Sequence, residues 1–391
     1  MKDWKEIKLE NLGEIITGKT PSRRNPEDWG NEMLFITPTD YGGYRKFAYF
    51  SNRNLSRKGI KRLKNKVLPK NSILVTCIGS QMGLVVMNKK KAITNQQINS
   101  IIPKSEIADH NFLYYTLKGM QSRLRVLASG GTAVPILNKG DFEKIKILLP
   151  PLPEQRAIAA VLSSLDDKID LLHRQNETLE AMAETLFREW FIEQADEDWE
   201  EGTLGDEFEI IMGQSPPGSS YNEEGIGTPM YQGNRDFGFR FPTNRVFTVQ
   251  PKRFAQKYDT LISVRAPVGA QNMANEVCCI GRGVSAFRYK NDPGNYTYTF
   301  YKLKSLMNEI KQYNQTGTVF GSISKTDFQQ MKVLVPKEED IQVFQNIAKP
   351  IDKRINNNSE QIRTLTQLRD TLLPKLMSGE IRVKETEVIT D

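Results

Sequence analysis

Residues 14–21 read Glu-Ile-Ile-Thr-Gly-Lys-Thr-Pro and recur 195 residues later, at 209–216, as Glu-Ile-Ile-Met-Gly-Gln-Ser-Pro. Trp4 and Leu9 recur at the same offset as Trp199 and Leu204. A second set recurs at an offset of 186: Gly131-Thr132, Lys139, Asp141-Phe142 and the run Lys146–Pro150 return as Gly317-Thr318, Lys325, Asp327-Phe328 and Lys332–Pro336. The ends of the two units match and their middles differ, which predicts one scaffold that carries two different surfaces.

Each unit ends in a stretch with the heptad pattern of a coiled coil. Apolar residues alternate at spacings of four and three, with Asn176, Asn358 and Arg369 at polar slots. The expected seam consists of Leu165, Ile169, Leu172, Leu179 and Leu186 in the first stretch and of Ile351, Ile355, Ile362, Leu365 and Leu372 in the second. Two such seams on one chain can bury each other, and a pseudo-two-fold axis would make the helices antiparallel.

Both helices are expected to be interrupted. Pro350 lacks an amide hydrogen and clashes with the preceding turn, so it should kink or restart the second helix. Ser163-Ser164 could cap a restart at the equivalent place in the first. We therefore expect a short helix from Glu154 and a longer one from about Leu165 to Ile192, about 42 Å long at ~1.5 Å per residue. That length exceeds one turn of duplex DNA, ~34 Å, so the pair would serve either as a rigid spacer or only as an intrachain core.

The rest of each unit mixes strands and helices without regular alternation. Expected strands are 33–37, 73–76, 84–87, 98–102 and 145–149, with a helix at 111–127, and in the second unit strands at 260–264 and 284–289 with a helix at 298–312. The predicted fold class is α+β, with two pseudo-symmetric domains separated by two long helices that form an antiparallel coiled coil.

The charge distribution indicates a polyanionic partner. From Tyr41 to Ser105 the chain has 14 Lys or Arg and no Asp or Glu. In the second unit, Gly225 to Asn275 carries seven basic residues against Asp236 and Asp259. A solvated basic face would explain one such run, but repetition in both units, with interleaved Tyr and Phe in the first, favours a polyanion bound at two places.

The sequence gives no firm sign of catalysis. It lacks a phosphate-binding loop of the Walker type and the Asn-Pro-Pro-aromatic or Asp-Pro-Pro-aromatic signature of amino-methyltransferases. Gly281-Arg282-Gly283 is only a fragment of a dinucleotide-binding motif. The acidic clusters Asp166-Asp167 and Glu338-Glu339-Asp340 fit helix N-terminal charge better than a metal site.

The expected compartment is a reducing cytoplasm. Cys77, Cys278 and Cys279 form neither a paired framework nor a C-x-x-C motif. No apolar run approaches the roughly 20 residues needed to cross a bilayer, and the N-terminus lacks a signal-peptide apolar region.

Three motifs carry a resemblance to a known family. The run Leu149–Gln155, Leu-Pro-Pro-Leu-Pro-Glu-Gln, leads directly into the first heptad helix, and the chain closes with Leu372–Ile381, Leu-Leu-Pro-Lys-Leu-Met-Ser-Gly-Glu-Ile. Together with the repeated entry Gly18–Pro21 and Gly213–Pro216, these resemble the DNA-specificity subunit of type I restriction–modification systems. The resemblance extends from about Trp4 to Val383. The second copy departs from it at Pro336–Asp340, where Pro-Lys-Glu-Glu-Asp replaces the Pro-Pro-Leu-Pro-Glu form.

The resemblance implies a specific organisation. Residues 1–150 would form target recognition domain 1, 151–195 spacer helix 1, 196–336 target recognition domain 2, 337–380 spacer helix 2 and 381–391 a C-terminal tail. Each recognition domain would read one half of a bipartite double-stranded DNA site. The chain would be non-catalytic and would hold no cofactor. It would dock two methyltransferase subunits and, through them, restriction subunits, which would supply S-adenosylmethionine, ATP and Mg.

Candidate DNA contacts are side chains that can pair with base edges, mainly Arg, Lys, Asn and Gln, with some tyrosines. They are Lys19, Arg23, Arg24, Tyr41, Tyr44, Arg45, Gln81, Gln96 and Gln97 in the first unit and Gln214, Tyr231, Gln232, Asn234, Arg235, Arg240, Arg265 and Gln271 in the second. Most lysines from Lys58 to Lys70 should contact phosphate or nothing. The repeated Gly131-Thr132 and Gly317-Thr318 would be turn residues or backbone phosphate contacts.

Two other functions stay open at this point. One is a stand-alone nuclease or modification enzyme, which would show metal or cofactor dependence as the purified chain. The other is a coiled-coil assembly protein whose basic faces bind RNA or an acidic protein partner. Sequence-preferring duplex binding, seen only or best with methyltransferase subunits present, would separate a specificity subunit from the assembly protein.

Overall fold

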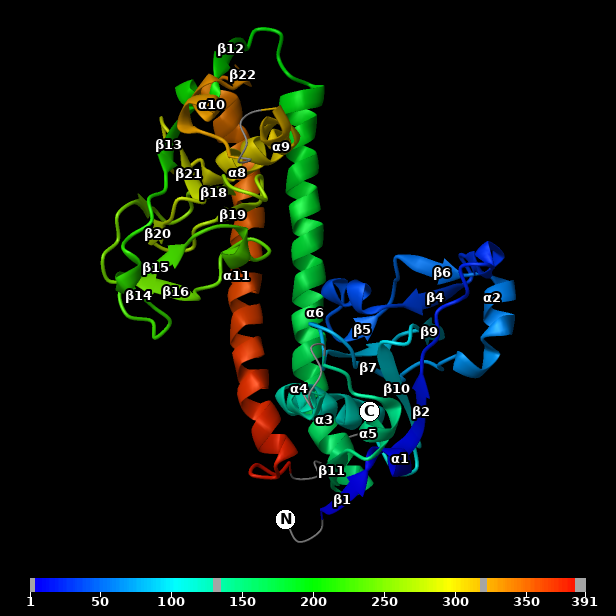
Figure 1. Ribbon diagram of the computed structural model, residues 1–391. Coiled ribbons are helices and arrows are strands. Elements are labelled where there is room, and N and C mark those ends of the chain that lie inside the picture. The colour runs from blue at the N-terminus through cyan, green and yellow to red at the C-terminus, as the bar shows by residue number, and fades with distance from the viewer. Residues whose placement is uncertain (1–3, 129–134, 317–321, 384–391) are drawn as a thin grey trace, which may run out of the picture. The chain divides into compact units, whose positions relative to one another are not determined.

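The computed structural model describes residues 4–128, 135–316 and 322–383 (Figure 1). It divides into two compact units: unit 1 comprises Met1–Asp170 with Arg363–Asp391, and unit 2 comprises Leu171–Ile362. Each unit has its own hydrophobic core and a part of both long helices. The two units are described separately below.

Unit 1 contains two main sheets. A five-stranded sheet has the order β2-β10-β7-β8-β5 and a four-stranded sheet the order β3-β6-β4-β9, while β1 pairs with β11. The strands are β1 Lys5–Lys8, β2 Gly13–Thr17, β3 Trp29–Gly30, β4 Met33–Ile36, β5 Phe47–Ala48, β6 Arg53–Leu55, β7 Ile73–Thr76, β8 Val85–Asn88, β9 Ala92–Thr94, β10 Ile98–Pro103 and β11 Lys146–Leu149. The short helices are α1 Leu9–Leu12, α2 Arg57–Arg62, α3 His110–Gly119, α4 Gln121–Ala128 and α5 Lys139–Glu143.

Unit 2 repeats this arrangement with changes in its middle. Its sheets have the orders β13-β21-β18-β19 and β14-β16-β15-β20-β17, and β12 pairs with β22 as β1 does with β11. The strands are β12 Glu200–Thr203, β13 Phe208–Met212, β14 Tyr221–Asn222, β15 Thr228–Tyr231, β16 Val246–Thr248, β17 Phe254–Ala255, β18 Thr260–Ser263, β19 Gln271–Met273, β20 Cys278–Ile280, β21 Val284–Tyr289 and β22 Lys332–Val335. The short helices are α7 Leu204–Glu207, α8 Tyr296–Ser305, α9 Met307–Thr316 and α10 Lys325–Gln330.

The expected strands are present within a residue or two, and the α+β class is confirmed. The two mid-unit helices, each expected as one segment, are split: α3 gives way to α4 at Met120, and α8 to α9 at Leu306. In unit 1, α3 ends at Gly119, and the Met120 amide donates to the Thr116 and Leu117 carbonyls at 3.2 and 3.1 Å. In unit 2 the Ser305 hydroxyl donates to the Lys302 carbonyl at 2.8 Å, and the Leu306 amide donates to the same carbonyl at 3.3 Å.

The two long helices are α6, Leu152–Arg188, and α11, Glu338–Met377, of 37 and 40 residues (Figure 1). A π-helical turn, Glu189–Glu193, follows α6. The expected restarts at Ser163-Ser164 and Pro350 are wrong, because both helices are continuous there. Ser164 donates to the Val161 carbonyl at 2.8 Å within the helix rather than capping a new one. Pro350 is exposed, so water can satisfy the carbonyl that lost its intrahelical partner.

The helices pack antiparallel within each unit, as predicted. In unit 1 the beginning of α6, with Ile158 and Leu162, shares a core with the end of α11, with Leu373 and Leu376. In unit 2 the end of α6 shares a core with the beginning of α11. Of the expected seam, Ile169, Leu172 and Ile355 are buried, and Leu165, Leu179, Leu186, Ile351, Ile362, Leu365 and Leu372 are half-buried.

The polar slots of the heptad pattern pair with one another or with a charged partner. In unit 2, Asn358 Nδ2 donates to Asn176 Oδ1 at 2.9 Å. In unit 1, Arg369 Nη1 donates to Asp166 Oδ1 at 2.7 Å. The buried Asp166 also accepts from the Tyr115 hydroxyl at 2.8 Å, which ties α3 to the same helix pair.

Arg382 lies beside Trp4 in unit 1. Trp4 Nε1 and Arg382 Nε donate to the two carboxylate oxygens of Glu154, each at 3.1 Å. Trp199 makes the repeat-equivalent bond in unit 2, with its Nε1 donating to Asp340 Oδ2 at 3.1 Å. The same contact thus joins the residue before β1 and the residue before β12 to the first turn of a long helix.

Candidate nucleic-acid interface

Four loops of unit 1 emerge at one edge of its sheets. β2 runs antiparallel to β10, with Thr17 opposite Asn99, and β10 runs antiparallel to β7, with Ile98 opposite Thr76. β4 and β9 are parallel and end together, with Ile36 opposite Thr94. The segments 18–24, 37–40, 77–84 and 95–97 therefore leave the strands at the same edge. We call these four segments the first loop edge.

Unit 2 has the same arrangement. β13 and β18 both pair antiparallel with β21, with Met212 opposite Ser285 and Ser263 opposite Val284. β15 and β20 are parallel, with Tyr231 opposite Ile280. The segments 213–217, 232–236, 264–270 and 281–283 consequently share one edge, which we call the second loop edge.

The repeated motif of the sequence fixes both edges with the same backbone hydrogen bonds. The amide of Lys19 donates to the Thr94 carbonyl at 2.8 Å, and that of Gln214 donates to the Ile280 carbonyl at 2.9 Å. The preceding amides also correspond: Gly18 donates to Ile98 and Gly213 to Val284, at 3.2 and 3.0 Å. A framework built from these bonds holds loops of different composition in the same way.

Glycine is required in that framework because the turn passes too close for a side chain. A Cβ on Gly18 would lie 2.2 Å from the Asn95 carbonyl oxygen, and a Cβ on Gly213 would lie 2.1 Å from the Gly281 carbonyl oxygen. Asn95 and Gly281 are themselves related by the offset of 186. The close contact explains why both copies of the motif keep glycine while the following residue changes from Lys19 to Gln214.

Most of the predicted DNA contacts lie on these edges. Exposed on the first edge are Lys19, Arg23, Arg24, Gln81 and Gln96, and exposed on the second are Gln214, Gln232, Asn234, Arg235 and Arg265. Gln97 is half-buried, and its Oε1 accepts from Asn95 Nδ2 at 2.9 Å. The structure thus brings together loop residues that are far apart in the sequence.

Three other residues of unit 1 that were predicted to contact DNA have hydrogen-bond partners within the protein. Tyr41 and Tyr44 are buried. The Tyr41 hydroxyl donates to the Leu74 carbonyl at 3.2 Å, and burial raises the pKa of this phenol well above its usual value. The Tyr44 hydroxyl donates to the Phe50 carbonyl. Arg45 is exposed but donates to Asp170 Oδ1 at 2.7 Å.

Three predicted DNA contacts of unit 2 also have hydrogen-bond partners within the protein. Tyr231 is fully buried, and its hydroxyl donates to Asn244 Oδ1 at 2.6 Å. Gln271 Nε2 donates to the Phe300 carbonyl at 2.7 Å and so ties β19 to α8. Arg240 is 1% exposed.

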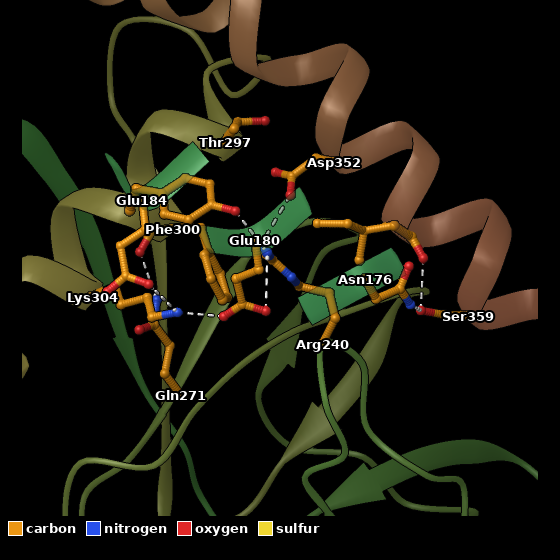
Figure 2. A network of polar contacts seen from close by, with 12 residues as sticks. Asn176, Glu180, Glu184, Arg240, Gln271, Thr297, Phe300, Lys304, Asp352 and Ser359 are labelled. Carbon is orange, nitrogen blue, oxygen red and sulfur yellow. Dashed lines mark hydrogen bonds and ion pairs between the residues drawn. The ribbon is translucent and has the colours of Figure 1, made fainter. Parts of the chain in front are cut away.

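Arg240 lies in a buried network between a loop of unit 2 and both long helices. Figure 2 shows its guanidinium among Glu180, Asp352 and Phe300. Its Nη1 is 3.3 Å from Asp352 Oδ1 and its Nη2 is 3.6 Å from Glu180 Oε2. The guanidinium carbon lies 3.8 Å from the Phe300 ring centroid. Burial raises the pKa of Asp352, against the opposing effect of Arg240.

Lys46 occupies the corresponding place in unit 1. It is 7% exposed, its Nζ donates to Ser163 Oγ of α6 at 2.9 Å, and it lies 5.1 Å from the Tyr115 ring centroid. Tyr115 corresponds to Tyr301 at the offset of 186, and the Tyr301 hydroxyl accepts from Arg240 Nη2 at 2.9 Å. Each unit therefore anchors a cation from its divergent middle on a repeated aromatic residue beside a long helix. Lys46 is not among the predicted site residues, although the alignment of Tyr115 with Tyr301 at the offset of 186 points to it.

The two acidic clusters have protein partners rather than a metal-binding arrangement. Asp166 pairs with Arg369, and Glu338 Oε2 accepts from the Tyr289 hydroxyl at 2.7 Å. Within residues 4–128, 135–316 and 322–383 no group of three or more His, Cys, Asp or Glu side chains is placed to hold a metal ion. Over the same ranges, no helix is both long and apolar enough to cross a membrane. Gly131-Thr132 and Gly317-Thr318 lie outside the described residues.

The family model and the similar proteins all indicate the same family. The model of the type I restriction modification DNA specificity domain matches residues 1–181 and 196–367. The chain is 29% identical over 421 residues to the type I restriction enzyme MjaIX specificity subunit of Methanocaldococcus jannaschii, covering 98% of this chain and 95% of that protein. It is 44% identical over 151 residues to the HindI specificity subunit of Haemophilus influenzae, covering 38% of this chain and 32% of that protein.

A solved structure shares the fold. The type I restriction–modification system S subunit from M. genitalium superimposes with a TM-score of 0.63 at 22% identity, covering 98% of this chain and 97% of that one. The matched family model covers most of both repeats. The chain therefore belongs to the family of DNA specificity subunits of type I restriction–modification systems, which bind DNA through two target recognition domains and leave catalysis to partner subunits.

Proposed function

We propose that each unit reads one half of a bipartite DNA site through its loop edge. The observation that carries this is the duplicated backbone framework. At equivalent positions it presents exposed Arg, Lys, Asn and Gln side chains, and the residue types differ between the two units. Such side chains are the usual readers of base edges in the major groove. The buried Tyr41, Tyr44, Tyr231 and Arg240 would support the loops rather than touch bases.

Phosphate contacts would come mainly from the basic segment 58–70 of unit 1. Lys58 and Lys61 on α2, with Lys64 and Lys70 after it, are exposed. Neutralising phosphates supplies much of the affinity of DNA-binding proteins and little of their sequence preference. Binding by unit 1 should therefore weaken steeply with salt.

The long helices would set the unread gap between the half-sites. The proposed recognition domains are residues 1–150 and 196–336, the proposed spacer helices are 151–195 and 337–380, and residues 381–391 form the tail. The family implies that the helices also dock two methyltransferase subunits, through which restriction subunits join. S-adenosylmethionine, ATP and Mg would then belong to those partners. The three buried, unpaired cysteines fit a cytoplasmic setting.

The test is to exchange residues 20–130 for the equivalent segment of a relative with a different target. The exchanged chain, assembled with its methyltransferase subunits, should methylate a site in which only one half has changed. Mapping methylated adenines in host DNA reads out both halves at once. A change in both halves, or in neither, would refute the assignment of one half-site to each unit. Exchange of residues 217–316 is the matched control and should change only the other half.

A further inference from the structure

The turn before β10 and the turn before β21 have the same backbone role and different side chains. Residues 95–97 read Asn-Gln-Gln, and residues 281–283, related by the offset of 186, read Gly-Arg-Gly. The amide of Asn95 donates to the Ile36 carbonyl at 3.2 Å, and that of Gly281 donates to the Tyr231 carbonyl at 2.9 Å. One backbone hydrogen bond closes each turn. The Ile98 amide donates to the Asn95 carbonyl, and the Val284 amide donates to the Gly281 carbonyl.

Gln96 and Arg282 are the central residues of these turns, and both are exposed. A hydroxyl from the entry motif contacts each turn at this residue. Thr20 Oγ1 donates to Gln96 Oε1 at 2.7 Å, and the amide of Arg282 donates to Ser215 Oγ at 3.2 Å. Thr20 and Ser215 are related by the offset of 195. The bond from Thr20 reaches the Gln96 side chain, whereas the bond to Ser215 holds the Arg282 backbone. The close approach of Gly18 and Gly213 to the turn carbonyls restrains the backbone in both copies.

The guanidinium of Arg282 makes no hydrogen bond or ion pair with any described side chain. Two other arginines of unit 2 are paired: Arg245 with Asp236 at 3.0 Å and Arg288 with Asp259 at 2.7 Å. An arginine on a restrained turn with its fork unpaired can donate two parallel hydrogen bonds to a ligand.

Base recognition explains this position better than phosphate binding. A phosphate contact would favour a cation in both copies, but the first copy has the neutral Gln96. Glutamine can instead pair bidentately with adenine, and arginine can pair bidentately with guanine. Exchanging one for the other on a fixed backbone would exchange the base that is preferred.

We propose that positions 96 and 282 are equivalent base-reading positions. Gln96 reads an adenine in the half-site of unit 1, and Arg282 reads a guanine in the half-site of unit 2. This proposal rests on the proposed function and names a specificity-determining residue within each loop edge.

The experiment uses the full chain assembled with its methyltransferase subunits and a library of duplexes in which both half-sites are varied. Arg282→Gln should lose the preference for guanine at one base pair of one half-site, by on the order of 10- to 100-fold, with the other half unchanged. Gln96→Arg should alter one base pair of the opposite half-site in the same way. Arg253→Gln is the matched control, because Arg253 is exposed but lies outside the second loop edge.

The outcomes separate the two proposals. If Arg282→Gln weakens binding to all duplexes equally and keeps the same consensus, the residue contacts phosphate and the inference is refuted. If the variant binds and methylates as the unsubstituted chain does, the residue has no DNA contact and the inference is equally refuted. If the unsubstituted complex shows no bipartite consensus at all, the proposed function is refuted, and this inference is refuted with it. Unchanged thermal unfolding of the variants confirms that the fold is intact.

Discussion

Asn176 and Asn358 form a buried amide pair between α6 and α11 inside unit 2. Asn358 Nδ2 donates to Asn176 Oδ1 at 2.9 Å, and the two side chains are 1% and 0% exposed. Asn176 Nδ2 in turn donates to Ser359 Oγ at 3.3 Å (Figure 2). A single polar pair in an apolar seam weakens the seam but penalises shifted alignments, in which each amide would be buried without a partner.

Asn176→Leu should therefore destabilise unit 2 by roughly 1–3 kcal/mol, because the buried Asn358 amide loses its acceptor. The double variant Asn176→Leu with Asn358→Leu should recover most of that loss, because two leucines pack in the apolar seam and leave no buried amide without a partner. Urea denaturation of the three chains measures the difference. A single variant as stable as the double one would show that the pair has no energetic coupling.

Arg240→Met should cost about 3–5 kcal/mol, because Asp352 would stay buried without its cation. Arg235→Met on the exposed second loop edge is the control and should stay within about 0.5 kcal/mol of the unsubstituted chain. Denaturant titration with a probe in unit 2 reads both. If Arg240→Met is as mild as the control, the buried network does not anchor the loop.

The same variant should show a defined pH dependence. Burial already raises the pKa of Asp352, and removing Arg240 raises it further. A carboxyl with a raised pKa in the folded state costs stability only where it must ionise, so the deficit of Arg240→Met should shrink as the pH falls from neutral toward about 5. Adding Asp352→Asn to Arg240→Met should remove this pH dependence. A deficit that is constant with pH would point to lost packing rather than to an uncompensated charge.

The sequence was sufficient for the repeat, most strands and the antiparallel helices because these follow from local periodicity and from the duplicated motifs. It was not sufficient to separate Arg235, which is exposed, from Arg240, which is buried. Arginine and tyrosine suit both a DNA surface and the packing beneath it, and only contacts with distant residues, such as Asp352, decide between them. Arg282 is not among the predicted contacts, although the offset of 186 already aligns it with Gln96.

The cysteines provide a reporter of folding that is independent of DNA. All three are buried, and burial raises the pKa of the Cys77 thiol to about 12. Because the thiolate is the reactive form, the native chain should react only slowly with a thiol reagent at mildly alkaline pH, and denaturant should expose every cysteine to it. Absorbance of the released reagent follows both reactions. Fast labelling of Cys77 in the native chain would mean that the core of unit 1 opens readily.

The spacer proposal predicts the effect of lengthening both long helices. One heptad added after Asp170 and one after Ile362 would fall between the units and leave the pairs Asp166–Arg369 and Asn176–Asn358 within their own units. Seven residues add ~10.5 Å at ~1.5 Å per residue, so the unread gap should grow by about three base pairs at ~3.4 Å each, with both half-sites unchanged. The methylated sites of the complex report the gap directly. A heptad in only one helix is the control and should lower stability, because its apolar residues would have no partner. If the doubly extended chain folds and methylates with the original gap, the helices do not set the spacing.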